Sequence, residues 1–152
     1  MEYKKDTRTK NLTLRDIYVG DWVQVWSEQT ERYSPPLKII QICDDGTIYL
    51  VGSDEERPTP WEEDIKNVDA LPIDADLLRG FGFEQIMESY GSFRYGNNNF
   101  YFNTYSNELY DEDCPAGGFK VDFFHDLQSW LSYLSYDINF EWKGVENDRT
   151  RI

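Results

Sequence analysis

At 152 residues, the chain is long enough for one domain or for two small modules that share a core. Its formal net charge of −14 repels phosphate backbones, which argues against nucleic-acid binding through a basic face. Aromatic residues make up 16% of the chain and favour strands over an all-helical fold, because their side chains suit pleated, half-buried surfaces.

Cysteine content and hydropathy predict a cytoplasmic protein. Cys43 and Cys114 are isolated, and neither has a second cysteine at the spacing of metal ligands. The first residues are charged and lack the apolar region of a signal peptide. No stretch approaches the roughly 18 apolar residues of a membrane span. We therefore expect reduced thiols and no contact with a membrane.

Alternating apolar residues predict an N-terminal β module over residues 12–73, preceded by a flexible charged arm over residues 1–11. An Asp-Asp-Gly turn at residues 44–46 suits a hairpin. The expected strands are residues 22–26, 37–42, 47–51 and 65–73, the last confined to an edge by Pro72. A short first strand followed by such a meander is typical of a small, strongly bent barrel of the SH3-like kind.

A second, α+β module is expected over residues 74–143, followed by a flexible tail over residues 144–152. Asp74 is placed to cap a short helix that ends at Gly80 and Gly82. The main helix is expected over residues 123–135, with one buried face formed by Phe124, Leu127, Leu131 and Leu134. Strands are expected at residues 92–95, 100–105, 109–110, 119–121 and 137–142. The predicted fold class is thus α+β, with an antiparallel sheet packed by one main helix after the barrel.

Three short patterns give the chain a resemblance to a known family. They are residues 18–23 (Tyr-Val-Gly-Asp-Trp-Val), residues 72–74 (Pro-Ile-Asp) with Gly82-Phe83, and residues 125–128 (His-Asp-Leu-Gln). With these patterns the chain resembles a family of small uncharacterised proteins carried by phage-like and integrative elements of anaerobic gut bacteria. The resemblance implies an accessory protein of a mobile element with a two-part, β-rich fold, and it implies no activity.

The histidine and the carboxylate clusters, which are the candidates for catalysis, do not predict an enzyme. His125 is the only histidine, and Asp122, Asp126 and Gln128 are near enough in sequence to orient it. Its place in the first turn of an amphipathic helix favours a structural role. The clusters of carboxylates fall in expected loops, at residues 55–56, 62–64 and 111–113. No metal-ligand spacing and no cofactor motif accompany them, so we expect neither a metal nor a cofactor.

Aromatic side chains are the best candidates for interaction. Eleven tyrosines, nine phenylalanines and five tryptophans exceed what a core of this size encloses, so some must reach the surface, where such rings anchor protein interfaces. The candidate interaction or structural residues are Trp22, Trp26, Trp61, His125 and Gln128.

The sequence predicts a non-enzymatic protein-binding or accessory protein of a phage or mobile element. An acidic inhibitor that mimics DNA is the first alternative, and an enzyme that uses His125 is the second. The expected partner is a protein rather than a nucleic acid, and the oligomeric state stays open.

Overall fold

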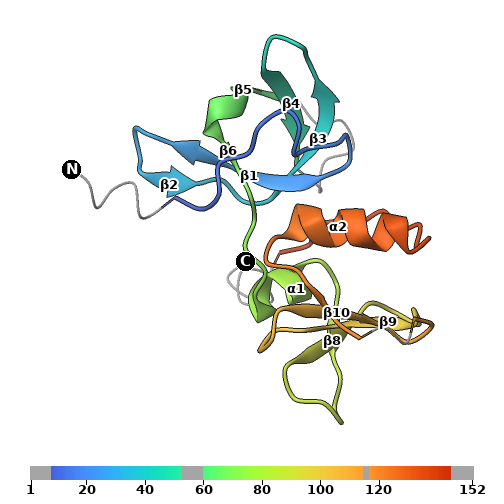
Figure 1. Cartoon of the computed structure of the whole chain (residues 1–152). Coiled ribbons are helices and arrows are strands. Elements are labelled where there is room, and N and C mark those ends of the chain that lie inside the picture. Colours follow the sequence, from blue (N-terminus) through green and yellow to red (C-terminus); the bar gives the residue numbers. More distant parts are fainter. Residues whose placement is uncertain (1–7, 53–59, 115–116, 145–152) are drawn as a thin grey trace. The chain divides into compact units, whose positions relative to one another are not determined.

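The computed structural model describes residues 8–52, 60–114 and 117–144. The chain forms two compact units, Met1–Pro72 and Ile73–Ile152, each with its own sheet (Figure 1). The predicted α+β fold, with an SH3-like β module followed by an antiparallel sheet and one main helix, is confirmed. No helix in these ranges is both long enough and apolar enough to cross a membrane.

Unit 1 is a curled, antiparallel half-barrel. Its elements are β1 (Trp22–Ser27), β2 (Arg32–Tyr33), β3 (Leu37–Ile42), β4 (Thr47–Val51), β5 (Trp61–Asp64), the 3-10 helix η2 (Ile65–Asn67) and β6 (Val68–Asp69). The strand β1 is central, because it pairs with β2, β3 and β6 at different points along its length. From β3 the sheet continues to β4 and then to β5, and η2 returns the chain to β6.

Buried apolar side chains form the core of the half-barrel. The fully or almost fully buried members are Trp22, Val23, Leu37, Ile39, Ile48, Leu50 and Val68. Every residue of β1 except the last is buried, on both faces of the strand. The segment before β1 accounts for this, because Leu12 is also buried and its N–H donates to the carbonyl oxygen of Val68 at 3.1 Å.

A fully buried carboxylate, that of Asp69 in β6, joins three parts of unit 1. Arg8 donates to it from Nε at 2.9 Å and from Nη2 at 2.6 Å. The Tyr33 hydroxyl donates at 2.6 Å and the Asn11 amide at 3.0 Å. Residues 8–11 are therefore fixed to the sheet, whereas a flexible arm was expected over residues 1–11. Residues 1–7 of that arm lie outside the described residues.

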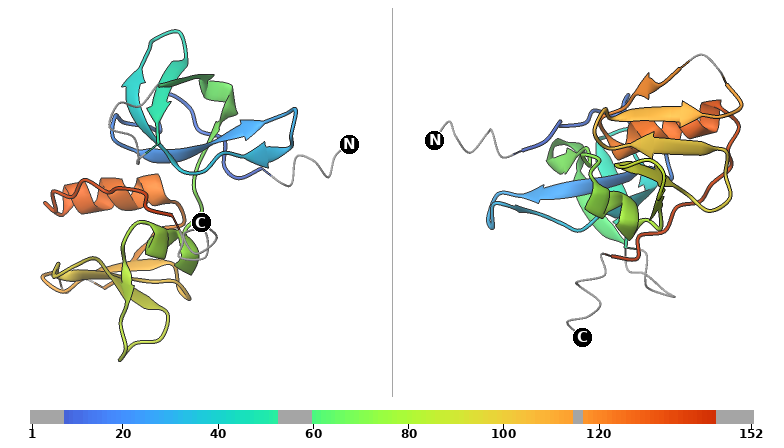
Figure 2. Two further views of the ribbon diagram at one scale, coloured as in Figure 1. Left: turned by 180° about the vertical axis from the view of Figure 1, so that it is seen from behind. Right: turned by 90° about the horizontal axis from the view of Figure 1, so that it is seen from below.

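Unit 2 is an antiparallel sheet with one face covered by a helix (Figure 1). Its elements are α1 (Ala75–Gly80), β7 (Glu84–Gln85), β8 (Ser92–Arg94), β9 (Phe100–Asn103), β10 (Glu108–Asp111), β11 (Phe119–Lys120) and α2 (Phe124–Tyr133). The strand order is β11-β10-β9-β8-β7, and the view from below shows these strands lying over α2 (Figure 2). Asp74 caps α1 as expected, accepting from the N–H of Leu77 at 2.8 Å.

Stacked aromatic rings form the core of unit 2. Phe81 lies parallel to Phe124 with ring centroids 4.1 Å apart, and Phe140 meets both rings edge-on. The Trp142 ring occupies the space that a Cβ atom at position 80 would need, which explains the glycine there. A substitution of Gly80 would therefore displace Trp142 from Phe81, which it contacts at a centroid distance of 5.0 Å.

Three local expectations were wrong. Residues 137–142 form no strand, because Phe140 is inserted among the rings of the core instead of pairing along a sheet edge. The strand expected over residues 65–73 is replaced by η2 and the two-residue β6. The acidic cluster at residues 62–64 lies in β5 and not in a loop, since this segment pairs with β4 along its whole length.

The buried face of α2 yields a stability prediction. Leu127 is fully buried, so Leu127→Ala should lower the free energy of unfolding by about 2–5 kcal/mol. Ser132→Ala, on the exposed side of α2, is the control and should change it by no more than ~0.5 kcal/mol. Urea unfolding followed by tryptophan fluorescence measures both. A loss under ~0.5 kcal/mol for Leu127→Ala would show that this face is not the packed one.

Asp69 gives a second prediction. Asp69→Asn replaces an acceptor oxygen by an NH2 group facing donors, so the free energy of unfolding should fall by at least ~2 kcal/mol. Asp45→Asn is the control in the same unit, because an amide oxygen can still accept from the N–H of Thr47. Chemical denaturation of the two variants should separate them clearly. Equal free energies of unfolding in the two variants would mean that the hydrogen bonds to Asp69 make no net contribution to stability.

Candidate functional site

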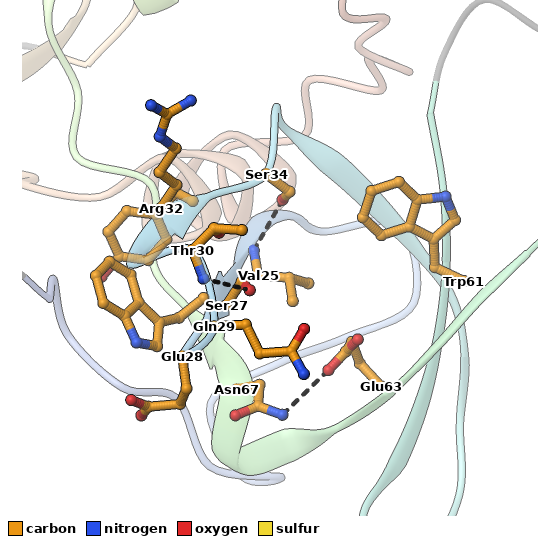
Figure 3. A pocket seen from close by; sticks show the side chains of 12 residues that line it. Val25, Ser27, Glu28, Gln29, Thr30, Arg32, Ser34, Trp61, Glu63 and Asn67 are labelled. Atoms are coloured by element: carbon orange, nitrogen blue, oxygen red, sulfur yellow. Dashed lines mark hydrogen bonds between the residues drawn. The ribbon is translucent and has the colours of Figure 1, made fainter.

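A pocket of about 720 Å³ opens in unit 1 between the β1–β2 hairpin and the β5–η2 segment (Figure 3). One wall is formed by the end of β1, the turn that follows and β2. The other wall is formed by Trp61, Glu63 and Asn67. All its lining residues belong to unit 1.

The pairing of β5 with β4 explains why Trp61 and Glu63 face the pocket. Trp61 lies opposite Leu50 and Glu63 opposite Ile48, and directly opposed residues of an antiparallel pair share a face. Leu50 and Ile48 are fully buried in the core, yet the Trp61 side chain is 46% exposed. The inner face of the half-barrel is therefore covered at β4 and open at β5.

The opposite wall is held in place by the buried network around Asp69. Trp26 is almost fully buried and meets Tyr33 edge-on, with ring centroids 4.8 Å apart. Arg8 lies over the Trp26 ring, with its guanidinium carbon 5.9 Å from the centroid. Burial, and then the hydrogen bond to Asp69, raise the pKa of the Tyr33 hydroxyl, so it remains a donor at neutral pH.

Polar side chains give the pocket an acidic character. Glu63 accepts from the Nδ2 amide of Asn67 at 3.1 Å, which holds its carboxylate against the wall. Glu28 contributes a second carboxylate from the hairpin turn. Among the described residues, Arg32 is the one cationic side chain that lines the pocket, and it extends away from the group formed by Gln29, Glu63 and Asn67 (Figure 3).

The structure brings two of the candidate residues together and separates the others. Trp26 and Trp61 line opposite walls of the pocket. Trp22 is buried in the core of unit 1, while His125 and Gln128 lie on α2 in unit 2. Sequence reasoning did not find the polar members Gln29, Glu63 and Asn67. The alternation of Trp61 and Glu63 along one strand was the available signal, but the acidic run around Glu63 obscured it.

His125 is almost fully buried in the first turn of α2. Its Nε2 atom lies 3.3 Å from Oδ1 of Asp126, and its ring lies near that of Phe123. It lines neither the pocket of unit 1 nor a second hollow in unit 2. This burial favours packing over reaction with a substrate, which would need access from solvent.

The second hollow, of about 530 Å³, lies between α2 and the segment that contains Cys114 and Phe119. Trp130 stacks on Phe119 at a centroid distance of 4.4 Å, and Tyr133 beside them is largely exposed. Cys114 also contributes to the lining as a free thiol. In contrast to the pocket of unit 1, this hollow is lined mainly by apolar atoms, and Asp126 is the one charged residue among its described lining residues.

Within residues 8–52, 60–114 and 117–144, no group of three or more His, Cys, Asp or Glu side chains is arranged to hold a metal ion.

Comparison of the chain with protein-family models, with curated proteins and with solved structures finds no match. The pocket in unit 1 is therefore the candidate functional site, on its geometry alone.

Proposed function

We propose that the chain is a non-enzymatic protein-binding protein, and that the pocket of unit 1 receives a segment of its partner. One observation carries this proposal: Trp61 occupies a core-facing position of the half-barrel but is 46% exposed. Burying the rest of this indole on a partner would gain about 25 cal/mol for each Å² of apolar surface removed from water. Tryptophan at such a position is a common anchor of protein interfaces.

The form of the pocket supports a protein segment as the occupant. Aromatic rings lie on both walls, from Trp26 and Tyr33 on one side and Trp61 on the other, and each wall also carries a carboxylate, from Glu28 or Glu63. A polypeptide offers apolar side chains for the rings and main-chain or cationic donors for the carboxylates.

We further propose that the protein is an accessory protein of a phage or mobile element. This proposal rests on the three short sequence patterns alone.

The arrangement of carboxylates gives less support to a DNA mimic, which would need acidic rows that resemble duplex phosphates. In β5, Glu62 and Glu63 point to opposite faces, and Glu62 accepts from the Tyr49 hydroxyl at 3.2 Å. At the third cluster Asp111 is buried and accepts from the Tyr136 hydroxyl at 2.7 Å. Residues 55–56 lie outside the described residues. We therefore favour recognition through aromatic side chains.

Trp61→Ala tests the proposed function. Pull-down from host lysate with the full chain should recover a partner that Trp61→Ala recovers at least about tenfold less, the equivalent of ~1.4 kcal/mol. The control is Tyr18→Ala, which removes another exposed aromatic side chain of unit 1 outside the pocket. Circular dichroism establishes that both variants are folded. Equal recovery by the wild type and Trp61→Ala would contradict the proposal, as would equal losses in both variants.

The salt dependence of the same pull-down separates the two binding hypotheses. Aromatic burial is not screened by ions, whereas attraction to exposed carboxylates is, so recovery should fall no more than severalfold when NaCl is raised from about 50 to about 300 mM. A steep loss over this range, together with competition by duplex DNA for a basic partner, would instead favour the DNA mimic.

A further inference from the structure

Within the part of the chain that the structure describes, one edge of the strand β5, beside the pocket, has no strand partner. Among the described residues its only strand partner is β4. The N–H of Ile65 donates to the carbonyl oxygen of Gly46 at 2.8 Å and continues the ladder between these strands. Main-chain groups alternate between the two edges of an antiparallel strand, so those of Trp61 and Glu63 face β4.

The alternate residues, Glu62 and Asp64, direct their N–H groups away from β4. The carbonyl of Glu62 points the same way, while that of Asp64 leads into η2. Unpaired groups of this kind form a template onto which another extended chain can add as a strand. Such a strand would lie about 4.8 Å from β5, on the side of the sheet where the half-barrel is open.

The side chains around this edge favour a basic strand. Glu62, Glu63 and Asp64 present carboxylates on both faces of β5, and Glu28 adds another on the far wall of the pocket. A lysine or arginine opposite one of them would stabilise the added strand as a cross-strand pair, and an acidic residue would destabilise it. Apolar side chains of the added strand would pack on the exposed Trp61 ring.

We propose that an extended, basic peptide segment of the partner binds by adding to β5 as a further strand. Alternate side chains of the added strand enter the pocket between Trp61 and the hairpin, and its main chain bonds to Glu62 and Asp64. This inference rests on the proposed function and specifies how the pocket recognises its partner.

A synthetic peptide of about eight alternating lysine and valine residues, capped at both ends, is the probe. Titrated into the isotope-labelled full chain, it should slow hydrogen exchange at the amides of Glu62 and Asp64 at least tenfold at saturation. The amide of Glu63, already directed toward β4, should change little. Absence of any change at peptide concentrations up to about 1 mM, where even a ~4 kcal/mol interaction registers, would overturn the inference.

Two N-methylated forms of this peptide separate strand addition from side-chain binding. Methylation of all valine amides or of all lysine amides removes the donors on one edge of the strand and leaves the charge unchanged. One form should bind at least tenfold more weakly than the other, because only one edge faces β5. Equal affinities of the two forms would overturn strand addition. If Trp61→Ala still failed to recover the partner from lysate, the proposed function would hold even though strand addition was overturned.

The charge requirement has matched controls in the peptide and in the protein. A peptide of alternating glutamate and valine should bind at least tenfold more weakly than the lysine form. Glu62→Gln combined with Asp64→Asn should weaken the lysine peptide severalfold, whereas Glu84→Gln, on the edge strand β7 of unit 2, should leave its affinity unchanged. Equal binding of the two peptides would overturn the assignment of a basic partner.

Discussion

The structure of unit 1 depends on the buried carboxylate of Asp69. A desolvated carboxylate is tolerated only when its oxygens accept enough hydrogen bonds, and here Arg8, Asn11 and Tyr33 supply them from well-separated parts of the sequence. Together these bonds fix the entering chain across β1 and fix β2 in place. Because Tyr33 also packs against Trp26, the carboxylate sets the position of one wall of the pocket. Unit 2 has no comparable dependence in its described residues, since its core is a set of stacked rings.

The elements that could be predicted from the sequence are those whose local pattern agrees with their packing. Residues 22–26, 37–42 and 47–51 alternate or carry β-branched side chains, and the turn at Gly46 has the positive φ of 94° that glycine adopts readily. The helix α2 was found within two residues at each end, because its apolar residues recur at helical spacing. In these segments, propensity and tertiary contacts favour the same conformation.

The remaining features depend on contacts that no local pattern records. The donors to Asp69 are separated from it by 36 to 61 residues, so neither the network nor the ordering of residues 8–11 was visible in the sequence. At residues 137–142, the aromatic alternation is typical of a strand, but stacking of Phe140 in the core determines the conformation. The pocket was predicted only in part. Trp26 and Trp61 were identified as candidates from the sequence, but nothing in the sequence indicates that they line the same pocket.

The strand β5 is where local preference and structure disagree most, and such conflicts are expected at functional sites. Glutamate and aspartate are poor strand formers, so this strand is held by its pairing with β4 rather than by its own propensity. The same carboxylates have a second effect at an exposed edge. Two copies of β5 placed side by side would oppose like charges, which disfavours self-association, whereas a basic strand would meet carboxylates on both faces. The acidity of β5 thus disfavours a second copy of the chain at this edge, in agreement with the basic partner that we propose.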